Sequence, residues 1–308
     1  MSAVLLSIQG GVSQGVLWGI MALGVYITFR VLDIADLTVD GSFALGGCVC
    51  AILIAGKGWN PILALAAALA AGALAGAVTG FLHTVCEIPA ILAGILTQLG
   101  SYSVCYRLME NKSNISLLQS DSIFTWLVDA TGWKQSVASM VLGIMLIVVI
   151  IILLYWFFGT EIGAAVRATG SNENMMRAQG VNTNVTKVLG LAVSNGLVGL
   201  SGGLVAQSQK YGDIQMGVGA IVIGLASIVI GEMLLMLLSR QSAFGTRLTA
   251  IIIGSVAYFV IRALVLRIEF VQPTDMKLIS AVIVALALSI PVFLKKARVR
   301  RSYTEGGR

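Results

Sequence analysis

Long uncharged stretches limit the folds open to this chain more than any other feature of its sequence. Only 11% of the residues are charged and 57% are hydrophobic, whereas a soluble domain carries roughly 25% charged residues. A helix needs about 20 apolar residues to cross a hydrocarbon core about 30 Å thick, and in lipid every backbone group must be paired internally. Eight segments fit this requirement: residues 4–29, 61–83, 89–106, 137–158, 188–209, 219–239, 246–266 and 276–294.

A ninth apolar segment, residues 41–55, is too short to span by itself. It provides only about 22 Å of helix at 1.5 Å per residue, so it spans only if it begins inside the polar run 30–40. We treat the two parts together as one interrupted span. The prediction is an all-α polytopic membrane protein with about nine transmembrane helices, in a range of about 8 to 10, in a single transmembrane domain over residues 1–308.

The polar run carries Asp33, Asp36, Asp40 and Arg30 between two apolar helices. It is either an ordinary loop whose Asp or Thr caps the next helix, or a broken helix that lies at membrane depth. In the second case Gly41 permits the bend, and a substrate pathway is lined by Thr38, Asp40, Gly41 and Ser42.

Polar side chains inside the predicted spans are scarce. Gln98, Ser194, Asn195 and Glu232 each satisfy a hydrogen bond between helices or face a pathway. We select Gln98 and Asn195 as further pathway candidates. Small residues recur every four positions in two spans and predict close helix packing, within the chain or in a dimer: Gly11, Gly15 and Gly19, then Ala64, Ala68, Gly72, Gly76 and Gly80.

The net charge of +6 comes largely from the end of the chain, where six of the twenty basic residues lie in the tail 295–308. Such a cluster beside a span indicates a cytoplasmic tail rather than a nucleic-acid partner. Counting back from the tail places residues 159–187 inside, as a cytoplasmic loop, and residues 109–136 outside, as an ordered extracytoplasmic loop.

The two halves of the chain share a short pattern. Aligning Arg30 with Lys210 also aligns Asp33 with Asp213, Ile34 with Ile214 and Gly19 with Gly199. In the predicted topology the two copies lie at opposite membrane faces, as an inverted repeat requires. Few positions agree, so chance similarity is the alternative.

The inside loop 159–187 contains a short predicted helix at residues 173–179. Gly170 and Gly180 bracket it, and Ser171 or Asn172 provides the N-cap. Met175, Met176 and Val181 form an apolar edge that a protein partner would cover. The alternative is a capped helix that is simply solvated.

The same loop carries a recognisable residue pattern. It resembles the cytoplasmic coupling loop of ABC permeases of the branched-chain amino acid and ribose type, and the similarity extends over most of the chain from QGVLWGIMALGVYITFRVLDIADLTVDGSF onward. In that family the short helix docks in a groove of the ATPase subunit. The resemblance therefore implies an ATPase-coupling set of Gly163, Arg167, Ala168, Gly170, Asn172, Met175, Met176, Ala178, Gly180 and Asn182.

The resemblance also implies the assembly and its substrate class. It implies two permease subunits, expected to form a homodimer, with cytoplasmic ABC ATPase subunits and an extracytoplasmic solute-binding protein in the lipid of a bacterial cytoplasmic (inner) membrane. The implied activity is import of a small polar solute, an amino acid ahead of a sugar or nucleoside. A possible second class is an ion-coupled secondary transporter, but its carboxylates should lie in mid-span, whereas nearly all fourteen acidic residues here lie in connections or at span ends.

Sequence motifs of catalysis are absent. The chain has no GxxxxGK[ST] phosphate loop, no HExxH and no GxSxG, so we expect no catalytic residues and no ATP bound directly. ATP would be used by the partner subunit. His83 is the single histidine, and the four cysteines lack metal-ligand spacing, so we expect no metal site. A membrane-embedded enzyme is therefore the weakest alternative.

Overall fold

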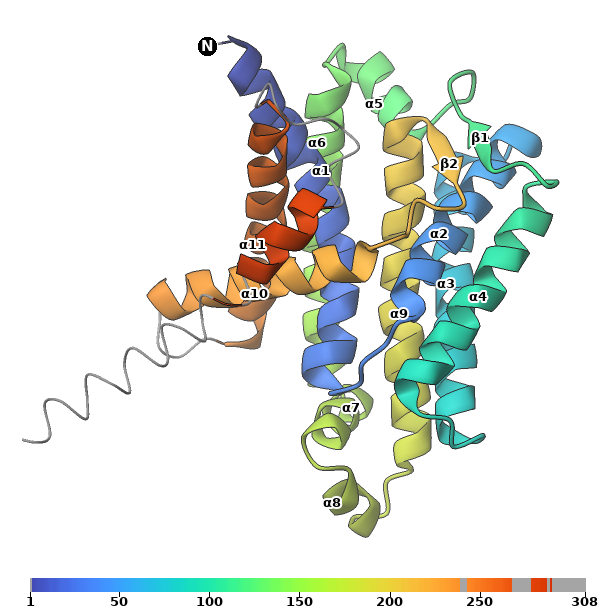
Figure 1. Ribbon diagram of the computed structural model, residues 1–308, viewed down its shortest axis with the longest axis vertical. Coiled ribbons are helices and arrows are strands. Elements are labelled where there is room, and N and C mark those ends of the chain that lie inside the picture. The colour runs from blue at the N-terminus through green and yellow to red at the C-terminus, as the bar shows by residue number, and fades with distance from the viewer. Residues whose placement is uncertain (1, 239–242, 268–277, 287–288, 290–308) are drawn as a thin grey trace, which may run out of the picture.

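The computed structural model describes residues 2–238, 243–267, 278–286 and 289 (Figure 1). Within these ranges, six helices are long and apolar enough to cross a membrane, which confirms an all-α polytopic membrane protein. Their helical cores are α1 (Ser2–Tyr26), α2 (Thr38–Ala51), α3 (Pro61–Thr84), α6 (Gln135–Gly159), α9 (Thr183–Gln209) and α11 (Phe244–Val265).

Two further helices occupy the positions of predicted spans. Helix α4 (Ala90–Leu108) carries several polar residues, and the apolar part of α10 (Ala220–Leu238) is shorter than the six spans. Of the predicted ninth span, residues 276–294, only 278–286 and 289 are described, and they are helical. The basic tail 295–308 lies outside the described residues, so the count of nine is not confirmed.

Both stripes of small residues pack against helices of the same chain. A Cβ added at Gly15 of α1 would lie 2.6 Å from the Cα of Val256 in α11. One added at Gly76 of α3 would lie 2.2 Å from the carbonyl oxygen of Leu191 in α9. Close backbone approach of this kind replaces the hydrophobic drive that lipid lacks, and it confirms the prediction of packing within the chain.

The interrupted second span is a helix broken at residues 32–37. Helix α1 continues through a π-helical turn, η1 (Ile27–Val31), after which residues 32–37 are non-helical and α2 begins at Thr38. Figure 1 shows this segment rising from the lower end of α1 to the middle of the bundle. Asn195, which contacts this region, lies near the middle of α9, about 20 Å from each end of that helix. This position inside the bundle supports the broken helix over an ordinary loop, and its depth in the membrane stays a prediction.

The second half of the chain repeats this arrangement in the opposite direction. Helix α9 is also followed by a largely non-helical segment, residues 210–219, and then by α10, which begins in the middle of the bundle (Figure 1). Helix α11 packs along α1 as α3 packs along α9. The shared order of helix, inward-turning segment and helix supports the inverted repeat over chance similarity.

The two long connections lie at opposite ends of the bundle (Figure 1). At one end, here called the α5 end, β1 (Asn114–Ser116) pairs antiparallel with β2 (Tyr211–Asp213), and α5 (Ile123–Thr131) follows. At the other, the α8 end, the chain forms α7 (Glu161–Ser171) and α8 (Glu173–Ala178). This separation agrees with the predicted topology, in which one connection is outside and the other inside.

Candidate functional site

A buried polar network fixes the start of α2 against α9. The Asp36 carboxylate accepts hydrogen bonds from the backbone N–H of Thr38 at 2.9 Å and from Asn195 Nδ2 at 2.7 Å. Ser42 Oγ donates to Asn195 Oδ1 at 2.7 Å. Asp36, Ser42 and Asn195 are each 0% exposed. Because water is excluded here, these hydrogen bonds hold α2 in one position on α9.

A second arm of this network consists of three threonines from three helices. Thr38 Oγ1 lies 2.7 Å from Thr79 Oγ1 of α3. Thr79 Oγ1 lies 2.8 Å from Thr97 Oγ1 of α4. Thr79 and Thr97 also reach the backbone carbonyls of Ala75 and Ala93 in their own helices. The network therefore ties the inward-turning segment to α3 and α4 as well as to α9.

Asp40 joins the two halves of the molecule. Its carboxylate accepts hydrogen bonds from the backbone N–H groups of Gly219 and Ile221, both at 2.9 Å. Gly219 lies just before α10 and Ile221 lies in its first turn, where N–H groups have no partner within the helix. A carboxylate at this position also complements the positive end of the helix dipole. The N-terminus of α10 is thus capped by a residue of α2.

The six predicted pathway residues come together but are mostly enclosed. Thr38, Ser42 and Asn195 are fully buried with hydrogen-bond partners, and Asp40 caps α10. A Cβ added at Gly41 would lie 2.9 Å from the Cα of Gln98, so Gly41 permits the close approach of α4. The chain turns at residues 32–37 instead, which corrects the assignment of a bend to Gly41. That these residues line a pathway stays a prediction.

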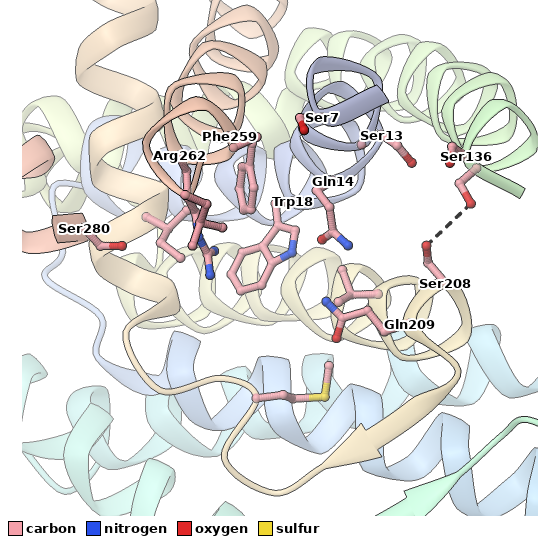
Figure 2. Close-up of a pocket in the computed structure, with 18 of the residues that line it drawn as sticks. Ser7, Ser13, Gln14, Trp18, Ser136, Ser208, Gln209, Phe259, Arg262 and Ser280 are labelled. Atoms are coloured by element: carbon pink, nitrogen blue, oxygen red, sulfur yellow. Dashed lines mark hydrogen bonds between the residues drawn. The ribbon is translucent and has the colours of Figure 1, made fainter. Parts of the chain in front are cut away.

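A cavity of about 1100 Å³ is lined in part by Gly219, the residue whose N–H donates to Asp40. Figure 2 shows side chains that line this cavity. Its walls come from α1, α6, α9, α10, α11 and residues 278–286. Many lining side chains are hydroxyls or amides. The polar lining residues include Ser7, Ser13, Gln14, Gln135, Ser136, Ser139, Ser208, Gln209, Arg262, Arg267 and Ser280.

The cavity extends from the α5 end towards the middle of the bundle. Gln135 and Tyr211 line it at that end, where both side chains are exposed. Met216 and Gly219, which lie just before α10, line its deep side. Gly219 donates to Asp40, so the cavity floor is the segment that the Asp40 cap holds. The molecule is therefore hollow on one side of this contact and packed on the other.

Arg262 and Trp18 give the cavity its chemical character. The Arg262 guanidinium lies 5.6 Å from the centroid of the Phe259 ring. The Trp18 ring lies 4.5 Å from Phe43 and 5.4 Å from Phe259, and its buried Nε1 has no hydrogen-bond partner in the described part of the chain. No described acidic residue lines the cavity. Its surface is therefore aromatic, hydroxylated and positively charged.

Sequence reasoning did not single out this cavity. The available signal was the presence of Gln14 and Arg262 inside two predicted spans, residues 4–29 and 246–266. An ionisable residue within a span tends to face a cavity. The side chains converge only through tertiary packing, because Arg262 and Trp18 come from opposite ends of the sequence.

At the α8 end, caps on two successive helices fix the connection 159–187. Thr160 Oγ1 accepts from Gly163 N at 3.2 Å and starts α7, whereas Asn172 Oδ1 accepts from Met175 N at 3.0 Å and starts α8. Gly180 ends this unit with φ of +81°, a conformation that favours glycine. The predicted short helix, its Asn172 cap and the Gly180 turn are confirmed. Helix α7 was not predicted.

Two glycines of α7 are required by close packing. A Cβ at Gly163 would lie 2.1 Å from the carbonyl oxygen of Phe157, and one at Gly170 would lie 2.0 Å from that of Val31. Helix α7 therefore touches the end of η1 backbone to backbone. On its exposed side, the Arg167 guanidinium lies 5.9 Å from the Phe244 ring centroid, and Ala168 is half-buried.

Glu173 organises the charges between α8 and α9. Its Oε1 lies 2.7 Å from Lys187 Nζ and 2.7 Å from an Arg177 guanidinium nitrogen, and it accepts a hydrogen bond from Thr183. The hydrogen bond from Lys187 lowers the pKa of the Glu173 carboxyl, although partial burial opposes this effect. Asn182 caps the following helix α9 through Asn184 N and Val185 N.

The two methionines of α8 face different ways. Met175 is 44% exposed, whereas Met176 is 6% exposed and packs inside the chain. The prediction of an exposed methionine pair is therefore wrong. Spacing on a six-residue helix does not show which side the rest of the chain covers. Met175 remains available to a partner, as does Ala178, which is exposed.

The fold and these sites are those of a membrane transport subunit, and sequence comparison gives the family. Residues 7–289 match the family described as the branched-chain amino acid transport system permease component, and the chain belongs to this family. It is thus an ABC-type permease, a class of transport subunits rather than enzymes.

Two relatives illustrate the range of the family. The tyrosine transport system permease protein of Clostridioides difficile (strain R20291) is 35% identical over 94% of this chain and 93% of its own length. The ribose import permease protein RbsC of Escherichia coli (strain K12) is 27% identical over 59% of this chain and 56% of its own length. No solved structure matches the chain.

Proposed function

We propose that this chain is the membrane-spanning subunit of an ATP-driven importer of a small polar solute, with an amino acid as the first candidate. The tyrosine permease relative, which covers nearly the whole chain, supports an amino acid. The ribose permease relative keeps a sugar, or a nucleoside, as the second candidate. The proposed location is a bacterial cytoplasmic membrane.

The observation that carries the proposal is the placement of two sites at opposite ends of one bundle. The cavity extends from the α5 end to a floor held by Asp40, and the doubly capped α7–α8 unit forms the α8 end. A solute delivered at one end would be released only if a change at the other end opened the floor. This separation of the cavity from the α7–α8 unit fits a transporter whose energy comes from ATP hydrolysis in a separate subunit.

The proposed partners follow from the two ends. An ABC ATPase, which would bind and hydrolyse ATP, would dock on the exposed side of α7 and α8, where Arg167 and Met175 lie. A solute-binding protein would dock at the α5 end over the cavity. A second permease subunit, most simply another copy of this chain, would complete the transmembrane part.

One observation favours a different class, an ion-coupled secondary transporter. Asp36 is a carboxylate that is wholly buried at the depth of the middle of α9 and has no cationic partner among the described residues. Such groups serve as coupling sites in ion-driven transporters. Here both oxygens are held by Thr38 and Asn195, which supports a positioning role for Asp36.

Reconstitution separates the two classes. The permease would be placed in proteoliposomes with the ATPase and the binding protein encoded beside it, and uptake of labelled amino acids would be followed. We expect uptake that requires ATP and persists when ionophores collapse the proton and sodium gradients. Uptake that follows either gradient without the ATPase would establish the secondary transporter instead.

Docking of the ATPase is tested on α8. Met175→Asp places a charge on the exposed side chain and should reduce co-purification of the ATPase severalfold, while Leu118→Asp, at a position 78% exposed at the α5 end, should leave it unchanged. A cysteine at Asn174 should react with an impermeant maleimide only from the cytoplasm. Labelling of that cysteine in intact cells would contradict the topology.

A further inference from the structure

We propose that the cavity at the α5 end is a binding site for the transported solute, and that it selects a molecule bearing both a carboxylate and a flat aromatic ring. The inference rests on the proposed function, because it assigns to the permease itself a recognition step within solute import. Arg262 would bind the carboxylate, and Trp18 with Phe259 would contact the ring.

Arg262 is placed to bind an anion. Its Cζ lies over the Phe259 ring, 5.6 Å from the centroid, and the guanidinium N–H groups remain donors that a ligand in the cavity can use. No acidic side chain pairs with it in the part of the chain that the structure describes. The planar guanidinium fork matches the two oxygens of a carboxylate. A cation that faces this cavity and has no acidic partner among the described residues therefore predicts a carboxylate ligand.

Trp18 provides a second, independent indication. Its side chain is 8% exposed, yet the indole Nε1 lacks a hydrogen-bond partner among the described residues. A buried N–H without a partner is rare in proteins and calls for an acceptor. Figure 2 shows the indole nitrogen turned towards the side of the cavity where Gln14 and Gln209 lie. An acceptor atom of a bound solute in this space would satisfy it.

The remaining surface suits the rest of such a solute. Trp18 and Phe259, whose ring centroids are 5.4 Å apart, form an aromatic corner beside Arg262 (Figure 2). Aromatic rings pack favourably in offset or edge-to-face contact with such a corner. The amide oxygens of Gln14 and Gln209 are neutral acceptors for an ammonium group. The volume of about 1100 Å³ leaves room for a small solute together with water.

The site would be tested by direct binding to the purified permease in nanodiscs. The probes are labelled L-tyrosine, tyramine, which lacks the carboxylate, and L-leucine, which lacks the ring. Wild-type protein should prefer L-tyrosine to both. Arg262→Gln should weaken L-tyrosine binding at least about tenfold, because a charge-assisted pair is lost, and should leave tyramine binding unchanged. Trp18→Phe, which keeps a ring but removes the N–H, should weaken L-tyrosine binding a fewfold.

Controls exclude a general effect on folding. Arg107→Gln removes an exposed arginine at the end of α4, outside the cavity, and should bind L-tyrosine as the wild type does. Arg262→Lys keeps the charge and should recover part of the affinity. All variants should elute as the wild type does in size-exclusion chromatography. If Arg262→Gln elutes as aggregate, the L-tyrosine affinities of Arg262→Lys and Trp18→Phe test the site instead. Wild-type affinity in both variants would then contradict the proposal.

Two results would overturn the proposal. One is equal L-tyrosine affinity of wild type and Arg262→Gln. The other is native mass spectrometry that finds a phospholipid bound through Arg262 and not displaced by L-tyrosine. ATP-dependent uptake by the complete wild-type complex reports on the proposed function separately. If Arg262→Gln supports uptake with an unchanged KM, the proposed binding site is wrong but the importer function stands. If L-tyrosine binding depends on Arg262 but no ATP-driven uptake occurs, the binding site stands and the importer function is wrong.

Discussion

Two carboxylate clusters in this molecule use similar contacts in different surroundings. Asp36 is 0% exposed, pairs with no cation in the described part of the chain, and depends on one backbone amide and the Asn195 side chain. Glu173 has a side chain 31% exposed and pairs with Lys187 and Arg177 at the α8 end. Water can replace the partners of Glu173 but not those of Asp36. The cluster with fewer charges should therefore matter more to stability.

Asp36→Ala should have the largest effect. The change leaves the Thr38 N–H and the Asn195 amide buried without an acceptor, at about 1–3 kcal/mol each. We expect a loss of about 3 kcal/mol, measured as a lower unfolding temperature in detergent. Asp33→Asn is the matched control, because Asp33 is exposed in the same segment and asparagine tolerates its φ of +55°. Equal stability of the two variants would contradict the comparison.

Asp40→Ala should have the next largest effect. Two amides at the start of α10 lose their acceptor, and loss of an N-cap reduces stability by about 1–2 kcal/mol. Asp40→Asn keeps one acceptor oxygen and should lose about half of that. Because Asp40 holds the cavity floor, Asp40→Asn should also change the uptake rate more than the yield of assembled protein. Asp129→Asn, on the exposed side of α5, should change neither. Normal transport by Asp40→Asn would show that the contact between Asp40 and the cavity floor does not control transport.

Glu173→Gln should have a small effect that depends on salt. A partly exposed ion pair contributes about 1 kcal/mol or less and is screened by added salt. The variant should differ from the wild type in the rate of limited proteolysis within residues 171–187 at low ionic strength. The difference should disappear at about 1 M salt, where the Debye length is only about 3 Å. A difference that persists in high salt would mean that Glu173 acts through packing instead.

The pH dependence of this cluster should be the smallest effect. The folded protein lowers the pKa of Glu173, so the stability it contributes is present above the ordinary Glu pKa of about 4.3. That contribution is lost as the pH falls through the lower folded value. Pepsin cleavage within residues 171–187, normalised to a reference peptide, should accelerate in this window for the wild type and not for Glu173→Gln. Acceleration of equal size in both would exclude Glu173 as the titrating group.

Local signals were sufficient for several parts of this structure. The uncharged stretches gave the spans, the short length of residues 41–55 gave the interruption, and Asn172 with Gly180 gave the limits of α8. In each case the cause lies within one segment, as apolar length, a capping side chain or a glycine turn. The coupling role of residues 159–187 came instead from the resemblance of their residue pattern to a family, and it stays a prediction.

Contacts between distant segments could not be predicted in this way. The burial of Met176 depends on how α8 lies against the rest of the chain, and the role of Gly41 depends on the approach of Gln98 in α4. The Asp40 cap joins Asp40 to Gly219, which lies in the other half of the chain. The cavity depends on the space that five helices leave unfilled, which no single segment encodes.

The glycine at position 170 has a mechanical consequence. A Cβ there would lie 2.0 Å from the Val31 carbonyl oxygen, so no side chain cushions α7 against the end of η1. A displacement of α7 would therefore move the backbone just before Asp33 directly, because no change of side-chain rotamer at this contact could absorb the motion. The distance that residues 32–37 move would then be set by the backbone contact between Gly170 and Val31.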